Sequence, residues 1–365
     1  MNPEFTHKLA QVRALLKPNQ ASAVLLGRQA NFSWLTCGSE GHVALISERA
    51  ACQLVVTRNE VFLIANRIEM PRLLAEEVSG LTLEAVVHDW YAGTGAVNAL
   101  KEIADPKKII SDTGDFGTRA VPDLISPLRY SLHPAEVKRL RKLSRLAEAA
   151  MAEACRAIKP GQDEFTIAAQ LTTSCMRRHV TPVVLLVAVD ERIRKFRHPL
   201  PTAKKLKRHA MLVLCARQHG LIVSVTRLVY FGKLPPDLRR RHHAACAIDA
   251  EFIRSTRIGT PVREIFRRAV AAYAGQGFPD EWQLHHQGGP CGYQTREYVA
   301  TPTVAGVVLE NQAFAWNPSI TGTKSEDTIL ATSRGPQILT ASRDWPMLKF
   351  TCDGETILRP DLLVR

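Results

Sequence analysis

The hydrophobic pattern of this 365-residue chain breaks around Ile125-Ser126-Pro127, and the two sides of the break differ in character. Between about residues 20 and 112, short β-rich runs such as 53–56 and 61–64 alternate with helical stretches such as 71–77. This alternation predicts a small α/β domain over residues 1–130. The chain is long enough to bury two substantial cores, so we expect two domains.

The second part, residues 131–365, is predicted to begin with a long helix. Pro134 stands near the first turn of this helix, a favoured position for proline. The apolar residues form one stripe along the helix, and charged residues such as Glu136 are expected to face away from that stripe. Strands are predicted at 211–215 and 221–225, joined through Gly220, and at 303–308, 313–316 and 327–331, with helices over about 236–274. The pattern predicts an α+β domain with helices outside a curved antiparallel sheet.

The formal net charge of +13 favours contact with anions, because a positive field attracts nucleic acid, acidic membranes or acidic substrates. The two densest basic clusters, 204–208 and 239–243, lack the interleaved aromatic residues of a stacking platform. We interpret them as solvated surface, which leaves nucleic acid as a minor hypothesis for a partner.

Eight cysteines are scattered from Cys37 to Cys352 without close pairs or zinc-finger spacing, so reduced thiols are expected. The first five residues lack the basic and apolar regions of a signal sequence, and no segment has the apolar length of a membrane span. The sequence therefore predicts a soluble cytoplasmic protein without a membrane partner.

Three polar segments follow one another near the C-terminus: His285-His286-Gln287-Gly288-Gly289, Trp316-Asn317-Pro318-Ser319 and Ser325-Glu326-Asp327-Thr328. Together with Ser224-Val225-Thr226-Arg227, they resemble the core of the creatinase and aminopeptidase P (Xaa-Pro peptidase) family. The resemblance covers nearly the whole chain. It implies the pita-bread fold, in which an α/β N-terminal domain precedes an α+β domain with a curved antiparallel sheet.

Most members of that family hold two metal ions with two Asp, one His and two Glu. By the resemblance, these ligand positions fall on Cys215 or Val213, Ser224, His286, Asn317 and Glu326. The choice between Cys215 and Val213 depends on whether two residues are missing before Gly220. Two cations need bridging carboxylates, and one retained carboxylate cannot supply them. The sequence therefore predicts a divergent member without a metal cofactor.

A single divalent ion is the alternative to a metal-free site. Cys215, His286 and Glu326 are zinc-ligand types, and catalytic zinc sites use three protein ligands. Cys215 is also explained as a buried strand residue that behaves as a small apolar group, and this interpretation is favoured.

The resemblance also implies the catalytic residues. His198 stands where peptidases of the family place a histidine that binds substrate and shuttles protons, and where creatinase, the metal-free member, has its acid/base. Imidazole suits this role because its pKa lies near neutrality. The predicted catalytic residues are His198, His286 and Glu326. His286 either hydrogen-bonds a substrate carbonyl or carboxylate, or pairs with Glu326 as a buried remnant.

Residues 288–298 depart most from the family pattern. A second active-site histidine is replaced by Tyr293 or, with a short insertion, by Arg296-Glu297. Arg296 is a candidate fork for a substrate carboxylate and Glu297 for a cationic group, or the two bond each other on the rim. Close backbone packing, rather than phosphate binding, explains the glycines. The predicted substrate-binding residues are Tyr293, Arg296, Glu297, Asn317, Ser224 and Cys215.

Three functions are compatible with these residues. The first is a metal-independent, creatinase-like hydrolase that cleaves a C–N bond of a small amide, amidine or guanidino substrate. The second is an Xaa-Pro aminopeptidase or dipeptidase with a remodelled metal site. The third is a non-catalytic binding protein on the same scaffold, as in histone chaperones. The family also implies a homodimer in which the small domain of one subunit reaches the active site of its partner. Asn31, Trp34 and Arg72 are candidates to close that site, or they serve the packing of the small domain itself.

Overall fold

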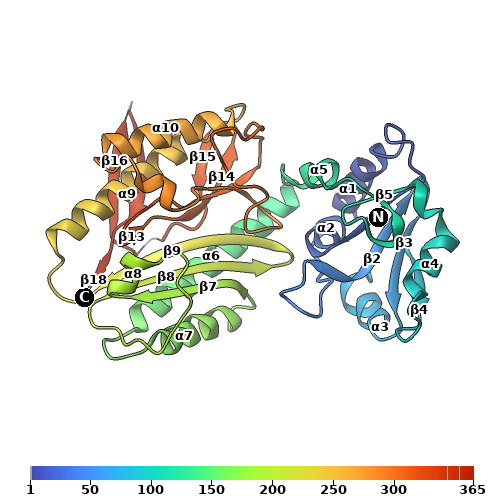
Figure 1. The fold of residues 1–365 in the computed structure, drawn as a ribbon, viewed down its shortest axis with the longest axis horizontal. Coiled ribbons are helices and arrows are strands. Elements are labelled where there is room, and N and C mark those ends of the chain that lie inside the picture. Colours follow the sequence, from blue (N-terminus) through green and yellow to red (C-terminus); the bar gives the residue numbers. More distant parts are fainter. Residues whose placement is uncertain (1, 343, 353) are drawn as a thin grey trace. The chain divides into compact units, whose positions relative to one another are not determined.

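The computed structural model describes residues 2–342, 344–352 and 354–365. The chain divides into two compact units, Met1–Glu136 and Val137–Arg365 (Figure 1). The sequence placed the division at residues 130 and 131, before the long helix α6 (Pro134–Ala157), whereas the units divide within the first turn of that helix. The reason is a buried ion pair that ties the start of α6 to the first unit.

The first unit is an α/β domain around a six-stranded sheet in the order β4-β3-β2-β1-β5-β6. Its strands are β1 (Ala23–Arg28), β2 (Arg49–Thr57), β3 (Val61–Asn66), β4 (Glu84–His88), β5 (Ile109–Ser111) and β6 (Arg119–Ala120). The β1–β2 and β2–β3 pairs are antiparallel and the others parallel. The β-rich runs predicted in this part are all confirmed as strands.

Helices surround this sheet. They are α1 (Pro3–Ala14), α2 (Gln29–Leu35), α3 (Met70–Arg72), which continues as a wider turn over Leu73–Glu77, α4 (Gly95–Ile103) and α5 (Pro122–Ile125). The helix predicted at 71–77 is therefore present. Asn2 caps α1, since its side chain accepts a hydrogen bond from the backbone of Glu4 at 3.0 Å.

A buried lysine joins both ends of the first unit. Nζ of Lys8 lies 2.7 Å from carboxylate oxygens of Glu4 and Glu136 and from the carbonyl oxygen of Trp34. Glu136 also accepts a hydrogen bond from the backbone of His133 at 2.7 Å. A charged residue off the apolar stripe of this helix can still be buried: Glu136 is 1% exposed because its carboxylate neutralises the buried Lys8.

The residues expected to close an active site instead serve the packing of the first unit. Asn31 and Trp34 are 0% and 1% exposed, and the Asn31 amide donates to the Asp112 carboxylate at 2.6 Å. Arg72 is half-buried and binds Glu77 at 3.0 Å. The burial of Asn31 and Trp34 fits the alternative interpretation, in which these side chains pack within their own unit.

The second unit contains two four-stranded sheets. The sheet β18-β9-β8-β7 combines β7 (Thr181–Val189), β8 (His209–Gln218), β9 (Leu221–Tyr230) and β18 (Leu363–Val364); only its β18–β9 pair is parallel. The antiparallel sheet β10-β11-β14-β15 combines β10 (Gly288–Cys291), β11 (Ala313–Trp316), β14 (Asp327–Thr332) and β15 (Gly335–Ile338). Two hairpins, β12 (Ser319–Ile320) with β13 (Thr323–Lys324) and β16 (Met347–Cys352) with β17 (Glu355–Pro360), complete the unit.

Helices flank these sheets (Figure 1). They are α6, α7 (Glu164–Met176), the short α8 (Glu191–Lys195), α9 (Pro236–Ser255) and α10 (Val262–Gly275). The predicted α+β arrangement and the hairpin through Gly220 are present. His219 and Gly220 both have positive φ, 52° and 73°, as a tight two-residue hairpin turn requires.

The prediction of a strand at 303–308 is wrong. This segment is irregular and makes a single bridge between Val307 and Pro261. Gly306 has a φ of 131°, which breaks an extended run, and the backbone of Val308 donates to Thr260 at 3.0 Å. Val308 is buried in a core of the second unit and Val304 packs against it, whereas Val307 is 46% exposed, and none of the three extends a sheet.

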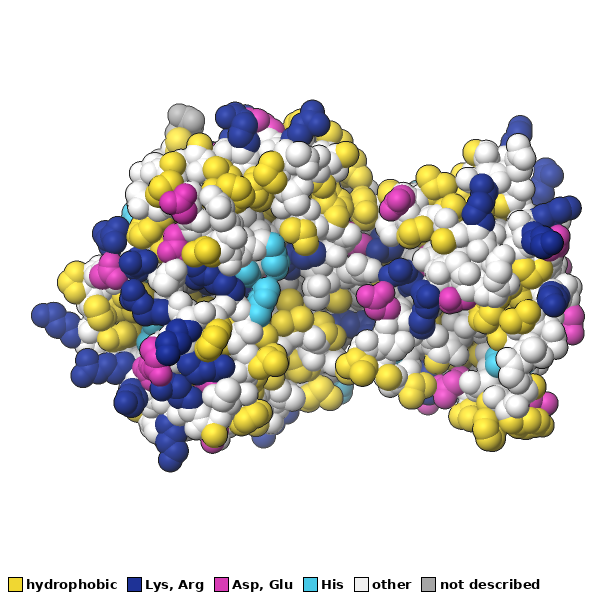
Figure 2. Space-filling view, in the orientation of Figure 1, with side chains coloured by type: hydrophobic (Ala, Val, Ile, Leu, Met, Phe, Trp, Pro, Cys, Tyr) yellow, Lys and Arg dark blue, Asp and Glu magenta, His cyan; other side chains and the backbone are white. Residues whose placement is uncertain are grey.

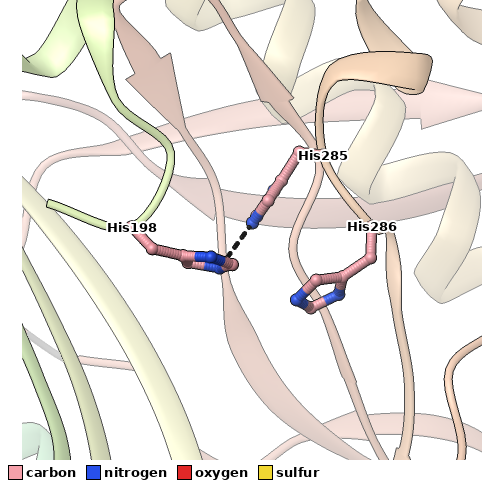
Figure 3. Close-up of side chains that lie close together, drawn as sticks. All are labelled: His198, His285 and His286. Carbon is pink, nitrogen blue, oxygen red and sulfur yellow. Dashed lines mark hydrogen bonds between the residues drawn. The ribbon is translucent and has the colours of Figure 1, made fainter.

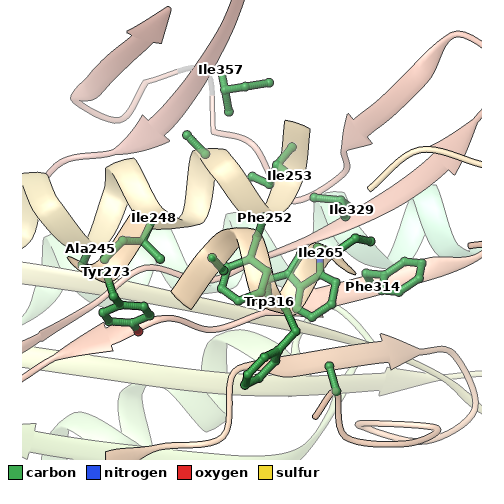
Figure 4. Packing of buried hydrophobic residues seen from close by; sticks show 14 of the residues in the cluster. Ala245, Ile248, Phe252, Ile253, Ile265, Tyr273, Phe314, Trp316, Ile329 and Ile357 are labelled. Carbon is green, nitrogen blue, oxygen red and sulfur yellow. The ribbon is translucent and has the colours of Figure 1, made fainter. Parts of the chain in front are cut away.

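An aromatic stack lies in the hydrophobic core between the sheet β10-β11-β14-β15 and the helices α9 and α10 (Figure 4). The Trp316 ring stacks between Phe252 of α9 and Phe314 of β11, with ring centres 4.6 and 5.4 Å away. The indole nitrogen of Trp316 donates to the Thr256 hydroxyl at 2.9 Å, so its polar atom is satisfied inside the core. The stack fixes the strand that leads into Asn317.

None of the helices in the described part of the chain combines the length and the apolar character that crossing a membrane requires.

We expect Lys8→Ala to lower the free energy of unfolding by about 3–5 kcal/mol, because two buried carboxylates lose their cation. Urea unfolding followed by tryptophan fluorescence measures this change. Arg67→Ala is the control, since Arg67 pairs with Asp89 at 2.9 Å while remaining 71% exposed. It should change unfolding little. Equal effects of the two substitutions would contradict the prediction.

Candidate functional site

The two sheets of the second unit meet where β9 lies against β14. The backbone of Thr226 donates to the carbonyl oxygen of Glu326 at 3.1 Å. The Thr328 hydroxyl accepts from the Ser224 amide at 2.7 Å and donates to the Ser224 carbonyl at 3.0 Å. Because one hydroxyl satisfies both backbone groups of Ser224, the strands remain joined without a regular ladder at this residue.

Cys215 and Ser224 face each other at this junction. They are opposite partners in the β8–β9 ladder, and Cys215 Sγ lies 3.3 Å from Ser224 Oγ. Val213, the alternative family position, pairs with Thr226 instead. Burial, and next the Glu326 carboxylate, raise the pKa of Cys215, so its thiol stays neutral at pH 7.

The Glu326 carboxylate is buried and fully engaged. Oε1 accepts from the Arg296 guanidinium at 2.9 Å, and Oε2 contacts Lys324 Nζ at 2.8 Å and the Thr226 hydroxyl at 2.6 Å. Burial by itself raises the pKa of this carboxyl. The charges of Lys324 and Arg296 outweigh burial and lower the pKa to about 2. Glu326 is therefore an anion at neutral pH and cannot act as a proton donor there.

Arg296 links two of the predicted positions. Its Nη1 donates to Ser224 Oγ at 3.1 Å, while its Nη2 binds Glu326. Its side chain is only 8% exposed, so the alternative of an exposed pair with Glu297 on the rim is wrong. Glu297 instead accepts a hydrogen bond from the backbone of Tyr293 at 3.1 Å.

Three histidines form a cluster at the surface of the second unit (Figures 2 and 3). His198 lies between α8 and β8, and His285 and His286 lie before β10, separated from it by Gln287. Nε2 of His285 lies 3.1 Å from Nε2 of His198, and one ligand nitrogen from each ring lies within 4.8 Å of the others. His285 is buried, whereas His198 and His286 are exposed.

All three imidazoles are neutral at pH 7. Burial, with Lys324 next in importance, lowers the pKa of His285 to about 2. Burial of part of the ring and the Arg296 charge lower the pKa of His286 to about 4, and burial and Lys324 also lower that of His198. The cluster therefore lies within the electrostatic reach of both cations that hold Glu326.

Two contacts fix the orientation of the adjacent histidines. The Gly288 amide donates to Nδ1 of His286 at 3.3 Å, so a neutral His286 carries its proton on Nε2. The Ser319 hydroxyl lies 3.3 Å from Nδ1 of His285, which directs Nε2 of His285 at His198. The exposed His286 ring thus carries an Nε2–H donor, whereas the buried His285 ring directs its Nε2 at His198.

An ion pair joins the two loops that carry the histidines. Arg197 donates to Glu281 at 2.6 Å and to the Thr321 hydroxyl at 3.0 Å, and Glu281 also accepts from the Thr321 backbone at 2.9 Å. Arg197 directly precedes His198, and Glu281 begins the short 3₁₀ helix Glu281–Leu284 that leads into His285. This contact holds the contributing segments together.

The buried carboxylate of Glu164 anchors the loop of His198 from its other side. One oxygen accepts from the Val189 backbone at 2.9 Å, and the other accepts from Arg192 and from the Thr202 backbone, the latter at 2.8 Å. Glu164 is 0% exposed and was not among the predicted residues. Its partners lie before and after His198, so it restricts the loop at both ends.

The glycines after His286 serve close packing, as predicted. Gly288 has a φ of 91°, and an added Cβ would lie 2.1 Å from the carbonyl oxygen of Ala315. At Gly289 an added Cβ would lie 2.5 Å from the carbonyl oxygen of Tyr298. Both clashes are with backbone, so no side chain fits without moving a strand.

The structure therefore brings the predicted residues together only in part. His198 and His286 lie in one cluster, while Glu326, Ser224, Cys215 and Arg296 are linked in another. His286 does not hydrogen-bond Glu326 in the described structure, so its interpretation as a buried partner of Glu326 is wrong. Tyr293 and Asn317 are 3% and 2% exposed, and Asn317 Oδ1 has no hydrogen-bond partner among the described residues.

His285 and Lys324 are the site residues that the sequence interpretation missed. Lys324 precedes Glu326 by two residues, and residues two apart in an extended segment share a face, so their proximity was available as a signal. For His285 the signal was its position beside His286. Which of two adjacent histidines turns toward a distant residue depends on tertiary contacts that sequence does not state.

Residues 138–333 match metallopeptidase family M24, and the chain belongs to this family. An uncharacterized peptidase of Staphylococcus haemolyticus is 21% identical over 359 residues, with 91% of this chain and 98% of that protein covered. An Xaa-Pro dipeptidase of Pyrococcus horikoshii is 21% identical over 354 residues, with coverage of 92% and 97%. The prolidase of Thermococcus sibiricus is structurally similar with a TM-score of 0.81 at 15% identity, over 100% of both chains.

These similarities confirm the resemblance inferred from the motifs and the predicted pita-bread fold. The assignment to hydrolases acting on C–N bonds is likewise confirmed by the family. The identities of 15–21% fit a divergent member of the family. The chemistry of the site therefore depends on the residues of this chain rather than on those of its relatives.

Family M24 usually employs divalent metals, and the residues at the family's ligand positions do not fit a two-metal centre. They offer a neutral thiol, a hydroxyl, an amide, an imidazole and one carboxylate, and that carboxylate already binds two cations. Among the described residues, the side chains close enough to share one ion are His198, His285 and His286. This set differs from the predicted trio of Cys215, His286 and Glu326.

The lowered pKa of buried His285 makes folding pH-dependent. Below the unfolded value of 6.5 the unfolded chain gains a proton that the folded protein does not bind, until the pH nears 2. The contribution of neutral His285 to the free energy of unfolding is therefore fully present above pH 6.5. It decreases as the pH falls below 6.5, by at most about 1.4 kcal/mol per pH unit.

We expect His285→Gln to flatten this decline, measured as the free energy of unfolding in urea at several pH values between about 6.5 and 4. Slopes are compared rather than absolute stabilities, because the substitution also removes the contact to His198. The exposed His243, changed to Gln, is the matched control and should retain the wild-type slope. Parallel curves for His285→Gln and wild type would refute the assigned shift.

Proposed function

We propose that this protein is a hydrolase that cleaves a C–N bond of a small amide, amidine or guanidino compound by histidine-centred acid/base catalysis, without a two-metal centre. The 3.1 Å contact between Nε2 of His198 and Nε2 of His285 carries the proposal. One nitrogen of this pair must accept a hydrogen bond from the other. A buried histidine thereby orients an exposed one, which is the arrangement that a directed acid/base requires.

The roles follow from exposure and protonation. His198 is exposed and neutral, so it accepts one proton from water as the water oxygen bonds to the substrate carbon. His198 then returns this proton to the departing nitrogen as the C–N bond breaks, so the proton balance closes within one turnover. His286 carries a proton on Nε2 and donates a hydrogen bond to the carbonyl or amidine group under attack.

The two buried cations assist the same step. Arg296 and Lys324 leave a net positive charge around Glu326, since two cations face one anion. Negative charge that develops on the substrate during water addition is stabilised by such a field, more strongly in a poorly solvated site than in water. Glu326 fixes both cations and is a positioning residue in this scheme.

An Xaa-Pro peptidase with a remodelled single-metal site is the second candidate. It is favoured by the three neutral imidazoles, which are competent zinc ligands, and by the Xaa-Pro dipeptidase among the relatives. A zinc ion there would activate water. A non-catalytic binding role is weaker, because a scaffold needs no contacting set of neutral histidines.

The expected assembly is a homodimer, as in the family resemblance, and the expected compartment is the reducing cytoplasm. The second point is supported by the eight cysteines, all of which are free thiols.

Replacing His198 tests the proposed chemistry. We expect His198→Ala to reduce turnover of an amide, amidine or guanidino substrate found by screening by about a hundredfold or more. His243→Ala is the control, since this histidine is exposed on α9 outside the cluster. Unchanged turnover in His198→Ala would exclude His198 as the acid/base.

Metal content separates the two candidates. We expect less than about a tenth of an equivalent of bound transition metal by elemental analysis, and turnover that survives chelation. One tightly held equivalent that is lost in His285→Ala, together with chelator-sensitive release of amino acids from Xaa-Pro peptides, would instead establish the single-metal peptidase.

A further inference from the structure

The side chains around Glu326 form a closed set of charged contacts at the family's metal-ligand positions. One guanidinium spans two of those positions, since Arg296 binds Ser224 Oγ at 3.1 Å and Glu326 Oε1 at 2.9 Å. Lys324 Nζ takes the other oxygen of Glu326 at 2.8 Å. A metal ion would have to displace a cation from each carboxylate oxygen.

Burial distinguishes these contacts from ordinary surface ion pairs. The side chains of Arg296, Lys324 and Glu326 are 8%, 4% and 2% exposed. Charges removed from water to this extent interact strongly, and losing a partner leaves an uncompensated buried charge. Neither cation can leave Glu326 without such a cost, so they are permanent parts of the site.

The positions of Cys215 and Asn317 bring no carboxylate to a metal. Cys215 offers a buried thiol 3.3 Å from the Ser224 hydroxyl, and Asn317 offers an amide oxygen. A divalent ion would therefore meet one carboxylate and two positive side chains. Coulomb repulsion from the two cations opposes its entry.

We propose that the guanidinium of Arg296 and the ammonium of Lys324 replace the divalent metals of this family as resident cations, so that the Glu326 position binds no metal. The inference deepens the proposed function by naming the groups that supply its positive charge. It rests on that function only for the reaction, because metal binding is measured without a substrate.

The test is equilibrium dialysis of the full chain against Mn²⁺ alone, an ion that prefers carboxylate ligands. Wild type is compared with Glu326→Gln, and the double variant Cys215→Asp/Ser224→Asp is compared with the same variant carrying Arg296→Leu. The last pair differs only in the guanidinium, so it isolates the effect of that cation at a site with restored carboxylates.

We expect wild type and Glu326→Gln to take up the same small amount of Mn²⁺. The variant that lacks Arg296 should bind Mn²⁺ at least about tenfold more tightly than the double variant that retains it, because a nearby like charge is removed. Wild-type binding that disappears in Glu326→Gln would overturn the proposal. Equal affinities of the paired variants, including no binding by either, would also overturn it.

A second measurement decides the matter if the multiple variants do not fold. Arg296→Ala should melt at a lower temperature than wild type, and millimolar guanidinium should raise the melting temperature of this variant but not of wild type. Tetramethylammonium at equal concentration is the control for ionic strength. If guanidinium did not raise the melting temperature of Arg296→Ala more than tetramethylammonium does, the proposal of a resident cation would be contradicted.

The proposed reaction can fail separately. If no substrate were turned over in any screen while the metal-binding and melting results were as expected, the proposed reaction would be excluded and the inference about the resident cations would stand.

Discussion

The buried carboxylate of Glu326 organises the centre of the second unit. A charge that is 2% exposed must be compensated, and Arg296, Lys324 and the Thr226 hydroxyl provide this compensation from three separate segments. These contacts fix where the segment after β10 lies relative to β9 and β14. The same requirement that stabilises the junction between the sheets therefore determines the electrostatic character of the site beside it.

A second buried network lies on the other side of the same strand. Asp327 follows Glu326 directly, and successive residues of a strand point to opposite faces. Asp327 binds Arg227 at 3.0 Å and Arg359 at 2.7 Å, and Arg359 also binds Asp249 at 2.6 Å. Burial raises the pKa of Asp249 to about 6, although Arg359 opposes that shift. Adjacent carboxylates thus serve two functions, one in the site and one in its support.

Local patterns predicted the long helix α6, the helices α9 and α10, the strands at 53–56, 61–64, 211–215, 221–225, 313–316 and 327–331, and the tight turn at Gly220, since hydrophobic periodicity and turn chemistry depend on neighbouring residues. They did not predict α1, α2 or β7. The strand predicted at 303–308 is absent because Gly306 breaks the extended run and the segment makes a single bridge, between Val307 and Pro261. Family motifs led to the prediction of His198 and Glu326 as site residues, but they did not indicate His285 as the partner of His198. Nor does sequence reveal that Glu136, 128 residues from Lys8, neutralises it. Such pairings depend on long-range packing.

The contact between His198 and His285 joins residues 87 positions apart, and the ion pair that holds their loops spans 84. Contacts of this separation form late on a growing chain, because the first partner is synthesised long before the second and closing the intervening loop costs entropy. The β8–β9 hairpin can assemble from neighbouring residues alone. A chain released before Glu281 would therefore have that hairpin and His198 but no completed site, which makes the histidine contact a marker that the segment up to His285 has folded onto the loop of His198.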